Sequence, residues 1–179
     1  MIDSKQCILV LVDAQIKLIE HMSGKDRLIE NLAKAVKSAL MLGIPVIRTE
    51  QAPDKMGRTV PELETLLTKQ QPIHKKSFSC CGEPRFMAEL EKSGRNHVFL
   101  CGIETHVCIY LSAVDLKAAG YKPEIIADCV SSRKEIDSNI ALQRLGSEHV
   151  PSTCVETFLF DIIRTADHPR FRELITIIK

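Results

Sequence analysis

The stretch that decides the fold reads Val98-Phe99-Leu100-Cys101-Gly102-Ile103-Glu104-Thr105-His106-Val107-Cys108. Its first four residues are all apolar, which is typical of a strand that is buried on both faces. Gly102 ends the apolar run, and the pattern from Thr105 onward is that of a helix. A buried strand that turns into a helix indicates a parallel α/β sheet.

Cys108 lies in the first turn of that predicted helix. The N-terminal end of a helix carries partial positive charge and unpaired backbone N–H groups. We therefore predict a thiol with a lowered pKa, which would act as a nucleophile beside an oxyanion hole formed by the same turn. The alternative for any cysteine is a structural thiol, and we assign that role to the other six: Cys7, Cys80, Cys81, Cys101, Cys129 and Cys154.

Strand and helix patterns alternate along the whole chain. Strands are predicted over residues 7–12, 44–47, 72–74, 97–101, 124–127 and 152–155, and helices over 26–42, 60–67, 83–93, 105–119, 134–145, 156–163 and 169–178. Thr59 is the expected N-cap of the helix at 60–67. We predict one domain over residues 1–179 with a Rossmann-like, three-layer α/β/α fold. Its sheet is doubly wound and mainly parallel, with about six strands.

Composition excludes several classes of function. The chain has 179 residues and a formal net charge of +1, and it lacks tryptophan, which disfavours nucleic acid and anionic membranes as partners. The apolar run 8–12 is too short for a membrane span or a signal core, and an odd number of cysteines suits a reducing compartment, so we expect a cytoplasmic protein. No histidine pair has metal-ligand spacing, and no glycine-rich phosphate loop follows the first strand. We therefore expect no metal and no cofactor, and we disfavour a nucleotide-binding flavodoxin-like domain.

Polar residues follow the predicted strands at their carboxyl ends, where sites form in such sheets. Asp13 ends the first strand, where a buried carboxylate is costly unless it is paired. It is either a cap for the next segment or the base that takes the proton of Cys108. A lysine could pair with it, but Lys75 and Lys76 point to opposite faces of a strand and remain equivalent at this point. His106 lies two residues before Cys108 on the helix and faces another way.

At these residues the chain resembles the isochorismatase-like cysteine hydrolase superfamily, over nearly its whole length. Leu11-Val12-Asp13-Ala14-Gln15, Lys75-Lys76-Ser77-Phe78-Ser79 and Cys101-Gly102-Ile103-Glu104-Thr105-His106-Val107-Cys108 are similar to its strand, lysine and nucleophile motifs. In the lysine motif the lysine stands three residues before an aromatic residue followed by serine, which selects Lys75. The resemblance implies a catalytic triad of Asp13, Lys75 and Cys108. It also implies a cis peptide between Ile103 and Glu104, with the N–H groups of Glu104 and Cys108 forming the oxyanion hole.

Two departures narrow the function that the resemblance implies. Nicotinamidases of this superfamily carry an Asp-x-His metal motif, whereas Arg48-Thr49-Glu50-Gln51-Ala52-Pro53 has no such histidine. Isochorismatases proper lack the nucleophilic cysteine, so Cys108 argues against isochorismate as substrate. What remains resembles the metal-free branch of the superfamily, whose members are commonly homo-oligomers. The implied activity is hydrolysis of a small amide or a related C–N bond through a thioester acyl-enzyme.

Other interpretations stay open at this point. Within enzymes, the alternative is a hydrolase of a non-amide bond with Cys108 at the periphery. In a different class, the alternative is a non-catalytic or redox-sensing oligomer that keeps the fold. If the chain binds a small-molecule substrate, the residues that we expect to line the pocket are Gln15, Gln51, Phe78, Cys80 and Ile109.

Overall fold

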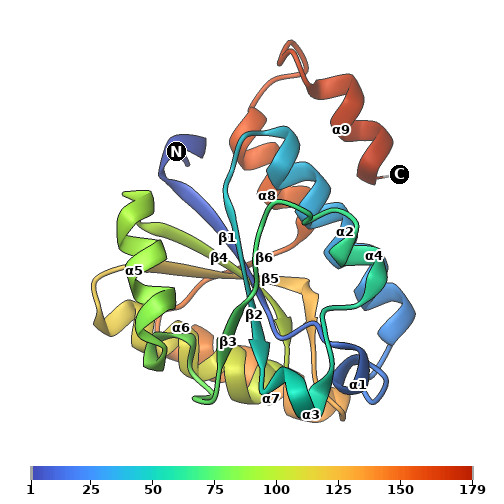
Figure 1. The fold of residues 1–179 in the computed structure, drawn as a ribbon. Helices are drawn as coiled ribbons and strands as arrows, with labels where there is room; N and C mark the ends of the chain where they lie inside the picture. The colour runs from blue at the N-terminus through green and yellow to red at the C-terminus, as the bar shows by residue number, and fades with distance from the viewer. Residues whose placement is uncertain (1, 179) are drawn as a thin grey trace.

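The computed structural model describes residues 2–178 and contains a parallel sheet with helices on both faces (Figure 1). Its strands are β1 (Cys7–Val12), β2 (Val46–Gln51), β3 (Ile73–Lys75), β4 (His97–Ile103), β5 (Lys122–Ser131) and β6 (Ser152–Thr153). They are arranged in the order β3-β2-β1-β4-β5-β6, and every pairing is parallel. The predicted fold class, a doubly wound sheet of six parallel strands, is confirmed.

The helices form the two outer layers (Figure 1). One face of the sheet is covered by α2 (Lys25–Met41), α4 (Pro61–Glu64), α8 (Val155–Ile163) and α9 (Phe171–Ile178), and the other by α5 (Pro84–Ser93), α6 (Tyr110–Ala118) and α7 (Glu135–Ser147). The short helices α1 (Ile16–Ile19) and α3 (Pro53–Met56) lie at the carboxyl ends of the strands. Because successive residues along each strand point to opposite faces of the sheet, each face buries its own apolar cluster.

The structure departs from the sequence-based elements in a few places. Thr59 does not cap α4: its hydroxyl and backbone N–H both donate to Glu50 Oε1 at 2.8 Å, and the N-cap position is held by Val60. The segment after β4 is first a π-helical turn, Thr105–Ile109, and becomes α-helical only in α6. The short helices α1 and α3 were not predicted, because four residues are too few to show a helical period.

Gly102 allows β1 and β4 to approach each other closely. It pairs with Val12 in the register of the two strands, and its φ is +116°. A Cβ atom at this position would stand 2.0 Å from the carbonyl oxygen of Val12, so only glycine fits. The two strands flank the point where the strand order reverses, and in doubly wound sheets that point is where ligands bind.

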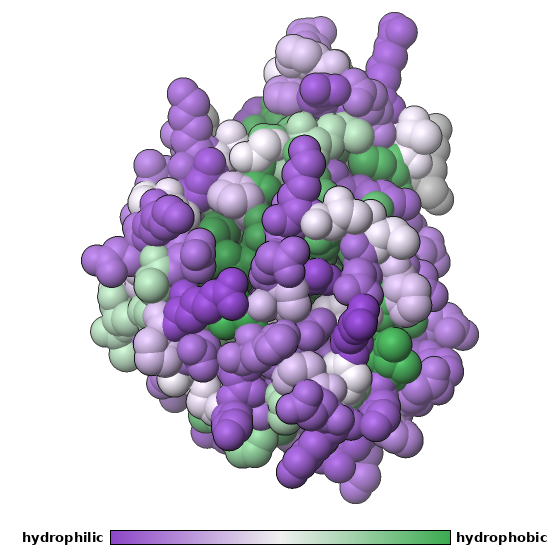
Figure 2. All heavy atoms as spheres, in the orientation of Figure 1, coloured by the Kyte–Doolittle hydropathy of each residue, from purple (hydrophilic) through white to green (hydrophobic). Residues whose placement is uncertain are grey.

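The molecular surface is mainly polar. Figure 2 shows a hydrophilic face with hydrophobic residues in small patches. Large apolar side chains that are exposed include Phe78, Leu111, Ile136 and Ile140. Among the helices of residues 2–178, none combines the length and apolar character that a membrane span requires.

Candidate active site

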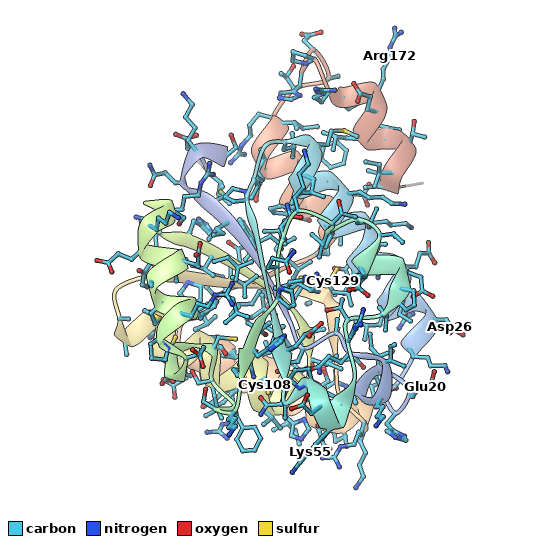
Figure 3. The ribbon with its side chains drawn as sticks, viewed as in Figure 1. Glu20, Asp26, Lys55, Cys108, Cys129 and Arg172 are labelled. Atoms are coloured by element: carbon cyan, nitrogen blue, oxygen red, sulfur yellow. The ribbon has the colours of Figure 1, made fainter. Side chains whose placement is uncertain are left out.

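A carboxylate, an ammonium and a thiol meet at the carboxyl end of the sheet. Lys75 Nζ lies 2.7 Å from Asp13 Oδ2 and 3.7 Å from Cys108 Sγ. The negative charge of Asp13 also acts on the thiol of Cys108. In Figure 3, Cys108 lies toward the end of the sheet where α1 and α3 are found. The structure therefore brings together three residues that are far apart in sequence.

Each of the three side chains comes from the end of a different strand. Asp13 directly follows β1 with a φ of 50°, and Thr49 on β2 donates its hydroxyl to Asp13 Oδ1 at 2.8 Å. Lys75 is the last residue of β3, and its side chain is 0% exposed, whereas Lys76 is exposed to solvent. Cys108 lies in the π-helical turn after β4 and is 7% exposed. The alternation of strand side chains thus turns Lys75, not Lys76, toward Asp13.

The expectation of a lowered thiol pKa is wrong. Burial and the negative charge of Asp13 raise the pKa of Cys108 to about 12, and the positive charge of Lys75 offsets this only in part. Burial is the largest influence and alone would lower the pKa of Lys75, but the negative charge of Asp13, its hydrogen bond and the charges of Cys80 and Cys108 together raise that pKa above 10.5. At neutral pH the sulfur is therefore a protonated thiol and the Lys75 nitrogen is an ammonium, so the thiol needs a base when it reacts.

The turn that carries Cys108 is anchored to the loop after β5. The peptide bond between Ile103 and Glu104 is cis. The carboxylate of Glu104 accepts hydrogen bonds from the backbone N–H of Arg133 at 3.2 Å and from its Nε at 3.0 Å. His106 Nδ1 lies 2.9 Å from Ser132 Oγ, so this histidine pairs with the loop and not with Cys108. These contacts fix the backbone on both sides of Glu104.

The residues expected to line a substrate pocket divide into two groups. Gln15, Cys80 and Ile109 are each 0% exposed, and the Gln15 amide hydrogen-bonds the backbone of Gln51 and Gly57. These three residues lie beneath the surface of the site, so we do not propose that they contact a substrate. Phe78 is 58% exposed, and Gln51 is half-buried on the wall of a cavity of 810 Å³ that Lys75 and Ser77 also line.

Sequence reasoning missed the contacts that hold the triad in place. It assigned no partner within the protein to Thr49 or Gln51, whereas Thr49 binds Asp13 and Gln51 binds Lys75. One signal was available. Thr49 and Gln51 are two residues apart on β2, so their side chains point to the same face of the sheet, and the end of β1 lies beside them. Among residues 2–178, no group of three or more His, Cys, Asp or Glu side chains is arranged to hold a metal ion.

Fold and site together define a doubly wound α/β protein with a buried Asp, Lys and Cys cluster at the topological switch point. The isochorismatase domain family matches residues 7–157. Isochorismatase domain-containing protein 2A of Mus musculus is 35% identical over 173 residues, which cover 96% of this chain and 82% of the mouse protein. The chain belongs to the isochorismatase family.

Solved structures agree with this assignment. The MAR1 ribonuclease of Caenorhabditis elegans superposes with a TM-score of 0.92 at 31% identity, covering 99% of this chain and 91% of the worm protein. The YcaC gene product of Escherichia coli, described as an octameric hydrolase of unknown specificity, gives a TM-score of 0.88 at 20% identity over 98% of this chain and 94% of that one. The second likeness supports the fold alone. The chain therefore has the fold of an isochorismatase-family hydrolase.

Proposed function

We propose that the protein is a cysteine-dependent hydrolase of small amides or related C–N bonds, with Asp13, Lys75 and Cys108 as its catalytic residues. The observation that carries this proposal is the buried ammonium of Lys75, which lies 2.7 Å from a carboxylate and 3.7 Å from a thiol. Buried charges are costly, and in proteins they are often found where proton transfer is needed. A cluster with only a structural role gains nothing from a thiol beside the buried ion pair at the switch point.

In the first half of the reaction, Cys108 Sγ attacks the carbonyl carbon while its proton passes to Asp13. The carbonyl electron pair moves onto oxygen, and the backbone N–H groups of Glu104 and Cys108 stabilise the oxyanion. The C–N bond then breaks, and Asp13 returns the proton to the leaving amine. Lys75 holds a positive charge beside the sulfur while negative charge develops there. A thioester on Cys108 remains.

In the second half, a water molecule gives a proton to Asp13 and attacks the thioester carbonyl. The C–S bond breaks, the acid is released, and the sulfur recovers its proton from Asp13. The two half-reactions balance in atoms and electrons without an oxidant or a cofactor. The alternatives, a hydrolase of a non-amide bond and a redox-sensing oligomer, differ in that neither forms a thioester on Cys108.

The proposal is tested by incubating the protein with a panel of small amides and carbamoyl compounds and measuring its intact mass. We expect a substrate whose acyl group is transiently added to Cys108, as located by peptide mapping. Cys108→Ala should lower the hydrolysis rate by about 10⁴-fold, the scale on which loss of a nucleophile acts. Cys81→Ala, at a half-buried thiol of the neighbouring loop, is the matched control. Unchanged hydrolysis in Cys108→Ala would contradict the mechanism.

An RNA oligonucleotide belongs in the same panel, because the C. elegans neighbour is called a ribonuclease. The net charge of +1 and the absence of tryptophan disfavour RNA as the substrate here. We therefore expect no cleavage that depends on Cys108.

We also propose that the protein is a cytoplasmic homo-oligomer. All seven cysteines are free thiols, which suits a reducing compartment. The exposed side chains of Leu111, Ile136 and Ile140 lie on α6 and α7, beside the turn that carries Cys108. Apolar residues exposed together are typical of surfaces that pack against another chain. The E. coli neighbour is described as an octamer.

A further inference from the structure

The ammonium of Lys75 has more acceptors than protons. Besides Asp13 Oδ2 and Cys108 Sγ, it lies 2.7 Å from Gln51 Oε1, 3.0 Å from the carbonyl of Phe78 and 3.1 Å from that of Ser77. An ammonium has only three N–H donors. The two shortest contacts, to Asp13 and Gln51, set where the nitrogen stands relative to the sulfur.

The amide of Gln51 is held in one orientation. Its Nε2 donates to the carbonyl of Lys76 at 2.8 Å, so its oxygen must face the ammonium. Its backbone is fixed as well, because Gln15 accepts from the Gln51 N–H at 2.7 Å and donates to the Gln51 carbonyl at 3.0 Å. In the register of the sheet, Gln51 is paired directly with Lys75.

Asp13 and Gln51 make the two shortest contacts with the Lys75 ammonium, and of these two residues Gln51 is the uncharged one. A neutral oxygen anchors the ammonium without cancelling its charge, whereas a second carboxylate would weaken the positive field at the sulfur. Both Gln51 and Lys75 also line the 810 Å³ cavity. We propose that Gln51 is a positioning residue, whose amide oxygen holds the Lys75 ammonium beside Cys108 and keeps its charge available to the developing thiolate. This inference deepens the proposed function and rests on it.

The test is the second-order rate of alkylation of Cys108 by iodoacetamide, measured by peptide mapping near neutral pH. Gln51→Glu preserves size and adds a charge beside the ammonium, and we expect it to slow alkylation at least about tenfold, the scale of one charge-assisted hydrogen bond. Gln51→Met removes the acceptor without adding charge and should slow alkylation less. Gln71→Glu adds the same charge at an exposed glutamine and should change the rate less than about twofold.

Circular dichroism and urea unfolding establish that each variant is folded, and Gln51→Met carries the test alone if Gln51→Glu does not fold. A rate within twofold of the wild type in a folded Gln51 variant would overturn the inference. Lys75→Met, with Lys76→Met as its exposed control, separates this failure from that of the proposed function. If Lys75→Met slows alkylation and the Gln51 variants do not, only the role of Gln51 is wrong. If Lys75→Met has no effect either, the triad itself is wrong.

Discussion

At pH 10 the protein should be about 7 kcal/mol less stable than at pH 8. Five thiols are buried: Cys7, Cys80, Cys101, Cys108 and Cys129. Burial raises the pKa of Cys7 to about 11 and the pKa values of Cys80 and Cys108 to about 12, and it raises the pKa values of Cys101 and Cys129 well above their ordinary value of 9.0. The unfolded chain therefore loses these protons first as the pH rises.

The sign of the effect follows from linkage. A neutral acid whose folded pKa is raised contributes stability below its unfolded pKa and loses that contribution as the pH rises above it. One unit above the unfolded pKa, each thiol costs about 1.4 kcal/mol, and the five act together. Urea unfolding at the two pH values, under reducing conditions, measures the difference. Cys129→Val should reduce it by about a fifth, and equal stability at both pH values in the wild type would refute this reasoning.

Gly102→Ala should be the most destabilising single substitution of a glycine. The new Cβ would stand 2.0 Å from the Val12 carbonyl oxygen, and the φ of +116° is unsuited to any L-residue. Either β1 and β4 separate or the backbone changes conformation, so we expect a loss above about 4 kcal/mol, beyond the common range for point variants.

The matched control is Gly94→Ala. Gly94 also has a positive φ, +65°, but a Cβ there would meet nothing within 4 Å. It should cost only about 1 kcal/mol, the strain of the left-handed conformation. Denaturant unfolding compares the two variants. If they lose equal stability, the close approach of β1 and β4 is not what requires glycine at position 102.

The fold could be predicted because its two central strands, β1 and β4, are almost entirely apolar. The runs at Cys7–Val12 and His97–Ile103 leave no polar face for solvent, and that pattern requires helices on both sides. That Asp13, a lysine of the pair Lys75 and Lys76, and the turn before Cys108 meet could be predicted because each stands at the end of a strand. Parallel strands bring their carboxyl ends to one edge of the sheet. The choice of Lys75 and the triad itself were implied only by the resemblance.

What could not be predicted depends on three-dimensional surroundings. A helix start suggests a lowered thiol pKa, but the pKa of Cys108 is set by burial and by Asp13, which comes from another strand. The π-helical turn at Thr105–Ile109 has the same apolar spacing as an α-helix over so few residues. The role of Gln51 depends on the register of β2 against β3, which residue types alone do not specify.

The most direct test of the central claim is the pH dependence of Cys108 alkylation in the wild-type protein. If Asp13 takes the proton of the thiol within the buried cluster, no proton passes to solvent. The rate should then change less than about twofold between about pH 6 and about pH 8, while a free cysteine derivative in the same solution reacts about tenfold faster per pH unit. A Cys108 rate that rises about tenfold per unit, like that of the free thiol, would show that the sulfur ionises to solvent without Asp13 and would contradict the account.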